Sequence, residues 1–562
     1  MTQGEDTTEK SGWSGAGVKE SADVLGEAGT EIGSSLVSVK ESGGRSLFGP
    51  IAITPVDQQY PDLISGMNQR FIGKPETVQL MDSYSQVVKI VQWAVSNGKR
   101  ITVRSGGHCF EDFVFNPGVQ VVLDVSKLDR IYFDATRNAV AVEPGATLLS
   151  LYEMLYEVWG VTIPGGICYS VGVGGHVSGG GWGLLCRQHG LISDHLYAVE
   201  AVVVDVTGKV RTVVATRNNS DPNRDLWWAH TGGGGGNFGV VTRYWFRSPG
   251  ASGNTPSTLL PKPPAEVLLN AISFPWGEIT QKEFTTLVQN YAAFHTANSA
   301  PDTPYTAFGS FLVLNHRSNG QIGLVTQIDA GVPNAERLLD DYLTAVTNGV
   351  EVEHQPFMAE MGEYNPMPEF FTPRRLPWLQ AVRYLGTNNS MLNDPTLRAD
   401  YKSAYMRSKF PSNQLAALYK HLTRADFSNP FASVTLSSFG GNVNAVAQHA
   451  TASAHRDSAF KLLWMVLWNT SVDDAKNLGW IREFYQETYA DTGGVPVSNA
   501  VTDGCYINYV DIDLSDPKYN KSSVPWHELY YKDNYPRLQQ AKRKWDPHNV
   551  FRHGQSVELP SA

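Results

Sequence analysis

The amino-acid sequence predicts an α+β protein in which one domain is split around a second, central domain. Up to about residue 247, short strand patterns alternate with amphipathic helices, and a proline-rich linker follows at 248–264. A long mixed stretch then extends to about residue 500, after which the chain is again aromatic and basic. The length of 562 residues is several times that of a typical domain, and a composition of 42% apolar and 18% charged residues permits a large core.

The first segment, residues 1–46, is rich in Gly, Ser, Glu and Thr and has no sustained apolar periodicity, which predicts a flexible leader. Order is expected to begin near Leu47. The pattern at 77–81 then predicts a strand, and Ser83-x-x-Gln86 is a capping-box signal for a helix that extends through Val95.

Later elements follow from the same patterns. The next strand, at 101–103, leads directly into Arg104–His108, and Leu148–Trp159 has the apolar spacing of a helix. Thr207-Gly208 is a turn between two strands of a hairpin. Further strands are expected at 119–123, 131–133, 139–142, 198–206 and 210–214, and further helices at 281–294 and 472–489.

Charge and cysteine content exclude several classes of protein. Forty-five basic and fifty-five acidic residues give a net charge of −10, so we expect neither nucleic acid nor an anionic membrane as a partner. No window has the roughly 18 consecutive apolar residues of a membrane span, and the N-terminus has no secretory signal pattern. Four cysteines favour a cytoplasmic enzyme and leave two disulfides open.

Glycine is concentrated in two windows. Of 52 glycines, 17 lie in 160–190 and 232–239, and such backbone can approach a ligand closely. Gly234-x-Gly236-x-x-Gly239 satisfies a dinucleotide-binding pattern but lacks the strand-before-helix setting of a Rossmann unit. Arg104–His108 follows a strand, so its N–H groups are able to surround a diphosphate, although a ligand-free glycine turn is an equal alternative.

Two nucleophilic side chains lie beside these glycines. His108 ends the first glycine segment, and Cys168 follows Pro164-Gly165-Gly166-Ile167. Taken alone, each is compatible with an inert buried side chain. Metal ligation fails on spacing, because the sequence has no Cys-x-x-Cys pair and the nearby histidines follow no familiar ligand pattern.

Five motifs occur together and in order, and they carry a resemblance. They are Arg-Ser-Gly-Gly-His at 104–108, Pro-Gly-Gly-x-Cys at 164–168, Val171–Gly181, Gly232–Gly239, and Tyr506-x-Asn508-Tyr509. Over about residues 50–557 the sequence resembles the flavin-linked oxidases of the vanillyl-alcohol-oxidase/PCMH superfamily, in the berberine-bridge-enzyme-like branch. Within this branch it is most similar to the bacterial hexose and glycoside oxidases of antibiotic biosynthesis.

The resemblance implies a PCMH-type FAD-binding domain of two α/β subdomains, with an inserted substrate domain built on an antiparallel sheet covered by helices. The implied division is 47–255 for the FAD domain, 256–500 for the substrate domain and 501–562 for a segment returning to the FAD domain. Members of this branch commonly hold FAD through two covalent bonds, and the matching residues are His108 and Cys168. The other FAD-binding candidates are Arg104, Ser105, Gly106, Gly107, Cys109, Gly165, Gly166, Val171, Gly172, Gly174, Gly175, His176, Gly181, Val240 and Asn508.

The resemblance also implies that Tyr509 is the catalytic base, with Tyr506 and Trp182 as the other catalytic candidates. A phenol titrates near pH 10, so neighbouring cations or hydrogen-bond donors must favour its phenolate. If 506–509 form a strand, Tyr509 faces the substrate while Tyr506 and Asn508 face the flavin. The family often has a second tyrosine where this chain has Trp182, which cannot share a phenolic proton, and Tyr169 is a substitute for it.

Oxygen use and substrate class complete the expectation. Val171 occupies a position at which valine accompanies oxidases in the family, so we expect O2 as the electron acceptor and H2O2 as a product. The expected substrate is a small molecule, a sugar or a glycosylated natural product; oxidative cyclisation of an alkaloid or polyketide and a catalytically silent flavoprotein are the alternatives. The oligomeric state is not indicated. Central aromatic residues are either ring-stacking contacts or core, namely Trp276, Trp378, Trp464, Trp468, Tyr291 and Tyr305.

Overall fold

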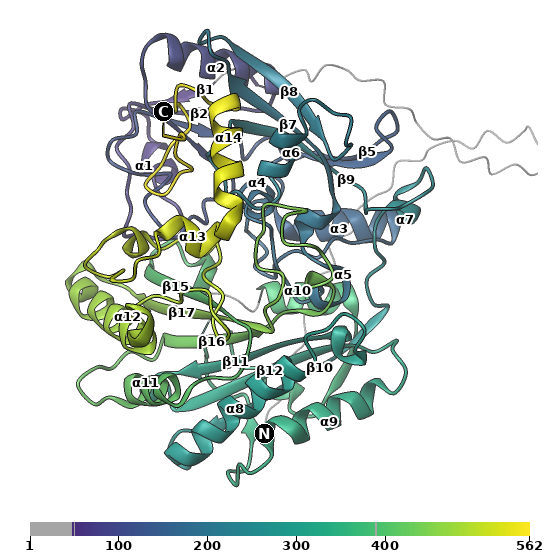
Figure 1. The fold of residues 1–562 in the computed structure, drawn as a ribbon, viewed down its shortest axis with the longest axis vertical. Coiled ribbons are helices and arrows are strands. Elements are labelled where there is room, and N and C mark those ends of the chain that lie inside the picture. Colours follow the sequence, from purple (N-terminus) through teal and green to yellow (C-terminus); the bar gives the residue numbers. More distant parts are fainter. Residues whose placement is uncertain (1–47, 50, 363, 388–390, 562) are drawn as a thin grey trace, which may run out of the picture. The chain divides into compact units, whose positions relative to one another are not determined.

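The computed structural model describes residues 48–49, 51–362, 364–387 and 391–561, so the leader expected at 1–46 lies outside the described residues. Three β-sheets organise the described chain (Figure 1). Two of them lie in the first half of the sequence, and the third is formed by the central segment. This arrangement confirms the α+β class and the antiparallel central sheet that the sequence predicts.

The first sheet has the strand order β1-β2-β4-β3, in which β2, β4 and β3 are parallel. Helix α2 (Tyr84–Ser96) starts after Ser83 as predicted, but the capping box is wrong. The Ser83 side chain makes no cap hydrogen bond, and Gln86 accepts instead from the Asp82 N–H at 2.9 Å. The elements are β1 (Ile51–Ile53), α1 (Tyr60–Leu63), β2 (Thr77–Leu80), β3 (Ile101–Arg104) and β4 (Val121–Asp124).

The second sheet is antiparallel and has the order β5-β6-β9-β7-β8, which confirms both predicted hairpins. Valines of β7 and β8 pack with those of α2 and the first sheet, so one apolar cluster joins the two subdomains. The strands are β5 (Ile131–Asp134), β6 (Ala139–Val142), β7 (Leu196–Val204), β8 (Val210–Thr216) and β9 (Val240–Phe246). The helices are α3 (Leu148–Trp159), α4 (Val173–Ser178), α5 (Cys186–His189) and α6 (Arg224–Ala229).

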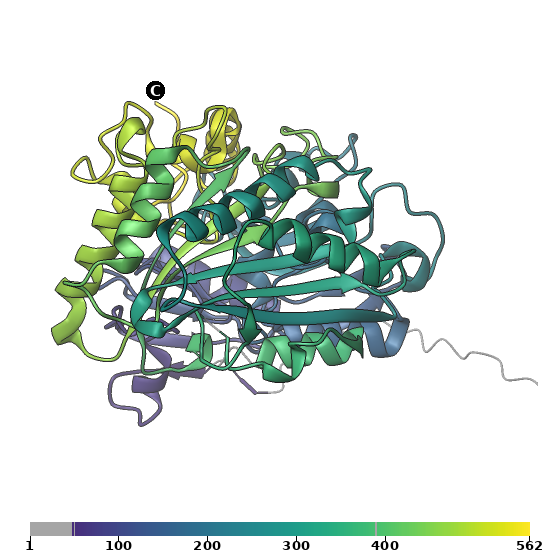
Figure 2. The same ribbon diagram turned by 90° about the horizontal axis from the view of Figure 1, so that it is seen from below.

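The third sheet is antiparallel, with the order β13-β10-β12-β11-β16-β17-β15 and β14 beside β10. Its strands are β10 (Glu266–Pro275), β11 (Phe308–Asn315), β12 (Gln321–Asp329), β13 (Gln355–Pro356), β14 (Arg374–Pro377), β15 (Arg398–Met406), β16 (Ala432–Ser438) and β17 (Phe460–Trp468). Helices lie along one face of it (Figure 2). The helices of this segment are α7 (Pro256–Leu259), α8 (Gln281–Ala297), α9 (Ala335–Thr347), α10 (Trp378–Thr387), α11 (Ser412–Thr423) and α12 (Asp474–Thr488).

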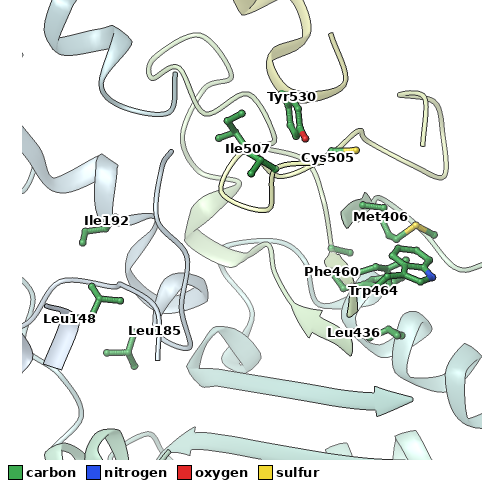
Figure 3. Packing of buried hydrophobic residues seen from close by; sticks show 14 of the residues in the cluster. Leu148, Leu185, Ile192, Met406, Leu436, Phe460, Trp464, Cys505, Ile507 and Tyr530 are labelled. Carbon is green, nitrogen blue, oxygen red and sulfur yellow. The ribbon is translucent and has the colours of Figure 1, made fainter. Parts of the chain in front are cut away.

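Side chains alternate along each strand of the third sheet between the face that packs in the large core and the opposite face. Even-numbered residues such as Leu436, Phe460 and Trp464 belong to the large core cluster, which Figure 3 shows at close range. Odd-numbered residues such as Phe311 and Leu463 belong to other clusters on the opposite face. Successive side chains of a strand point to opposite sides, so each strand serves both faces.

The C-terminal segment returns to the first domain. It contains α13 (Trp526–Tyr531) and α14 (Tyr535–Trp545), and Phe551 then forms a bridge with Ile101 of β3. Cys505, Ile507 and Tyr530 of this segment pack into the large core cluster (Figure 3). All four cysteines are free thiols, so neither disulfide that the sequence left open is formed. Within the described residues, no helix combines the length and apolar character needed to cross a membrane.

Candidate active site

A cavity of about 320 Å³ lies where the glycine loops of the first domain meet the third sheet and the C-terminal segment. Its size is that of a small-molecule site. The sequence-predicted site residues line it, except for three. Gly165 and Gly181 lie behind the lining, close to Tyr152 and Ile192 respectively. Val240 is buried in the cluster that joins the two subdomains, and Val241 lines the cavity instead.

Two glycine loops form one wall of the cavity. Gly106 and Gly172 pack so closely that a Cβ atom on either would overlap the backbone of the other. Gly107 has φ +76°, a left-handed conformation that glycine adopts without strain. Among the described residues, the N–H groups of Gly106, Gly107 and His108 have no acceptor. Successive unpaired N–H groups at a cavity wall form an anion-binding nest, which fits the diphosphate of FAD.

The Arg104 side chain has a structural partner. Its Nη1 donates to Oδ2 of the fully buried Asp124 at 2.6 Å, so this carboxylate offsets the guanidinium charge. The residue still lines the cavity, and its Nε has no hydrogen-bond partner in the described part of the chain. The main chain after β3 and the Nε–H of the guanidinium are therefore available from Arg104 to a ligand.

The second glycine window, 232–239, lies between α6 and β9. A helix followed by a strand is the reverse of the Rossmann order, which confirms that the dinucleotide pattern is coincidental. The glycines of this window differ in what surrounds them. A Cβ on Gly233 or Gly239 would collide with backbone carbonyls, so both are required for packing, whereas Gly235 faces the cavity with open space around it.

His108 and Cys168 meet at one hydroxyl. The Ser170 Oγ lies 2.8 Å from His108 Nε2 and 3.9 Å from Cys168 Sγ, and both nucleophiles line the cavity. Burial, with the charge of Arg104, lowers the pKa of His108 to about 4. The imidazole is therefore neutral at neutral pH and retains a lone pair for nucleophilic attack.

The tyrosine motif forms a turn and not the expected strand. The Tyr509 N–H donates to the Tyr506 carbonyl at 2.9 Å, which brings the two rings together at a centroid separation of 4.9 Å. Asn508 donates to the Tyr506 hydroxyl and to the His176 carbonyl, both at 3.0 Å. Burial raises the pKa of Tyr506 well above its usual value, so this phenol stays neutral.

Lys461 is a candidate functional residue that the sequence did not indicate. Its ammonium donates to the Tyr509 hydroxyl at 2.9 Å, and the residue is 1% exposed. The same nitrogen lies 3.8 Å from the ring centroid of Trp182, 4.1 Å from that of Tyr509 and 5.0 Å from that of Tyr506. A single cation among three aromatic rings favours negative charge on the phenol oxygen. Its signal in the sequence is one lysine within the apolar strand FKLLWMVLW.

The other aromatic candidates divide between cavity and core. Trp182 lines the cavity, and Tyr169 does not. Phe110, which the sequence analysis did not identify, stacks on Tyr401 at 3.7 Å and on Tyr509 at 5.6 Å between ring centroids. The six central aromatic residues, for which the sequence leaves ring stacking and core as alternatives, pack in or against the large core and do not line the cavity; they are Trp276, Trp378, Trp464, Trp468, Tyr291 and Tyr305.

Comparison with known proteins agrees with this geometry. An FAD binding domain family matches residues 75–213, and the berberine and berberine like family matches residues 505–558. Aclacinomycin-N/aclacinomycin-A oxidase of Streptomyces galilaeus is 49% identical, with 91% of this chain and 90% of that protein covered. Hexose oxidase of Chondrus crispus is 33% identical over 90% of this chain and 94% of its own length.

Solved structures give the same assignment. Aclacinomycin oxidoreductase superposes with a TM-score of 0.85 at 48% identity, covering 91% of this chain and 100% of that one. A glycopeptide hexose oxidase complexed with teicoplanin gives a TM-score of 0.84 at 44% identity, with 91% and 99% covered. With nearly full coverage of both sequence and fold, the chain belongs to the berberine-bridge-enzyme-like family of FAD-linked oxidases.

Proposed function

We propose that this enzyme is an FAD-dependent oxidase acting on a hydroxyl-bearing carbon of a sugar or a glycosylated natural product. The observation that carries the proposal is the contact between the Lys461 ammonium and the Tyr509 hydroxyl, at a cavity that the glycine nest also lines. The relatives support the substrate class, because they include oxidases of aclacinomycin and of hexoses. FAD, held by the glycine nest, would supply the hydride acceptor for this carbon and a route for two electrons to O2, which with two protons would give H2O2.

The protein's own part is to remove a proton. Tyr509 takes the proton of the substrate hydroxyl, and Lys461 stabilises the phenolate that makes this possible. Tyr506 is a neutral phenol that holds Asn508 and, through it, the segment carrying His176. These groups come from three parts of the chain, in line with the proposed division at 47–255, 256–500 and 501–562.

Replacing Tyr509 with Phe tests this role. Y509F is expected to keep bound flavin but to slow anaerobic flavin reduction at least a thousandfold, since the phenol oxygen is removed while the ring remains. Stopped-flow absorbance with aclacinomycin N, teicoplanin and D-glucose measures the rate. Y506F is the matched control, and its rate of flavin reduction should fall much less. A Y509F enzyme that reduces its flavin at the wild-type rate would place the base elsewhere.

We further propose that FAD is attached covalently through both His108 and Cys168. The support is their common position beside Ser170 in the cavity and the neutral imidazole of His108. H108A and C168A are each expected to keep yellow colour in the acid-precipitated protein, with altered absorption spectra, and the double variant to lose it.

Cys109→Ala is the matched control for these variants. Cys109 also lines the cavity, but burial raises the pKa of its thiol to about 12, which makes it a poor nucleophile. C109A should therefore retain both attachments. Retention of precipitated colour by the H108A/C168A double variant would refute the assignment.

A further inference from the structure

Two hydroxyl side chains on β16 line the cavity and have no hydrogen-bond partner among the described residues. Thr435 is 7% exposed and Ser437 is 3% exposed. Neither hydroxyl oxygen is among the fully enclosed, unpaired polar atoms of the described residues, so both hydroxyls open on the cavity and can hydrogen-bond a ligand that enters it.

The sheet register places this pair beside the base. Ser437 pairs with Lys461 on β17, and on its other side with Phe311 on β11. Adjacent strands lie about 4.8 Å apart, so the Ser437 hydroxyl is one strand away from the lysine that contacts Tyr509. Thr435 lies two residues further along the same face, about 7 Å away in backbone distance, and pairs with Leu463. This spacing is comparable to the length of one pyranose ring.

An aromatic wall stands next to the hydroxyls. Phe311 and Trp182 both line the cavity and meet edge to face, with ring centroids 5.9 Å apart. The Trp182 Nε1 is a buried donor with no acceptor within the described parts of the chain. Apolar ring faces beside several unpaired polar groups match a sugar, which presents an apolar face of C–H groups and a rim of oxygen atoms.

We propose that Thr435 and Ser437 are specificity-determining residues that bind oxygen atoms of a substrate sugar ring and present its reacting carbon to Tyr509. The inference rests on the proposed function, which names the reaction but not the groups that recognise the substrate. Phe311 covers the apolar face of the ring, and Trp182 donates a further hydrogen bond from its indole.

Binding is tested separately from turnover, in full-length holoenzyme carrying Y509F. Isothermal titration calorimetry measures the Kd of aclacinomycin N, teicoplanin and D-glucose. Adding T435V or S437A is expected to raise the Kd at least tenfold for each probe that binds the Y509F enzyme. Ser433→Ala is the matched control, because Ser433 lies on the same strand and face, also lacks a hydrogen-bond partner among the described residues, and does not line the cavity. A variant that unfolds is recognised by its lost flavin content and is replaced by T435A or S437G, which also remove the hydroxyl.

The outcomes separate the two proposals. Tenfold weaker binding for T435V and S437A, with S433A unchanged, supports the sugar subsite. Unchanged Kd values in all three variants, or no binding of any probe to the Y509F enzyme, overturn it. Probe binding without flavin reduction in the wild-type enzyme refutes the proposed oxidation while leaving the subsite supported.

Discussion

Replacing Lys461 with Met removes the charge beside Tyr509 while keeping a flexible side chain of similar length. A unit positive charge 2.9 Å from a phenolate oxygen contributes about 6 kcal/mol at an effective dielectric constant of 20. Burying the ammonium offsets part of this energy, and the net value of a hydrogen bond to a charged group is about 2–3 kcal/mol. We therefore expect K461M to slow flavin reduction about 30- to 160-fold at pH 7.

The pH profile distinguishes loss of charge from loss of packing. Without the ammonium, the phenolate forms only at higher pH, so the half-maximal reduction rate of K461M is expected to shift upward in pH. Titration of Tyr506 or His176 does not explain such a shift of the pH profile. Burial raises the pKa of Tyr506, and burial, with Lys461, lowers the pKa of His176 to about 4. K461R, which keeps the charge, should recover most of the rate. The reasoning fails if K461M matches the wild-type rate across pH 6–9 in anaerobic stopped-flow measurements.

Three other predictions concern the flavin environment and stability. V171L is expected to slow reoxidation by O2 at least tenfold with reduction unchanged, and equal reoxidation rates would exclude oxygen control by Val171. G172A should lower flavin content, because its Cβ would overlap the facing loop, whereas G277A has open space outside the cavity and should bind flavin normally; similar absorbance in both would contradict this. Burial lowers the pKa values of His176 and His230 to about 4, so the unfolded chain binds more protons than the folded protein between pH 6.5 and 4. The free energy of unfolding therefore decreases as the pH falls through that window. Each histidine changes the free energy of unfolding by about 1.4 kcal/mol per pH unit in that window. Denaturant titrations that give equal unfolding free energies at pH 7 and pH 5 would disprove this prediction.

Local patterns predicted the framework of the first domain well. The helix at 148–159 has the predicted bounds, and the strands at 131–133 and 139–142 form the predicted hairpin. In these segments apolar spacing and turn residues agree with the tertiary packing. The motifs also identified about half of the residues that line the cavity, since glycines that must approach a ligand or another backbone leave a compositional signal that does not depend on distant contacts.

The contacts that complete the site could not be predicted in this way. Lys461 is 48 residues from Tyr509, and only the third sheet brings its ammonium to the phenol. The turn at 506–509 has no glycine or proline to mark it, so its tyrosines favoured a strand. The central tryptophans are core residues because of their even positions on the sheet or their helix packing, which depends on a register that composition does not show.

The alternation of side chains between the two faces of the third sheet has a consequence for how the substrate range of this enzyme can change. On β16 and β17, positions 435, 437 and 463 line the cavity, while the residues between them pack in the core beneath the helices that cover the sheet. Changes at positions 435 and 437 can therefore alter which molecule is accepted without disturbing the large hydrophobic core. Single substitutions at these positions can change the substrate, while the stability of the fold and the oxidation chemistry stay the same.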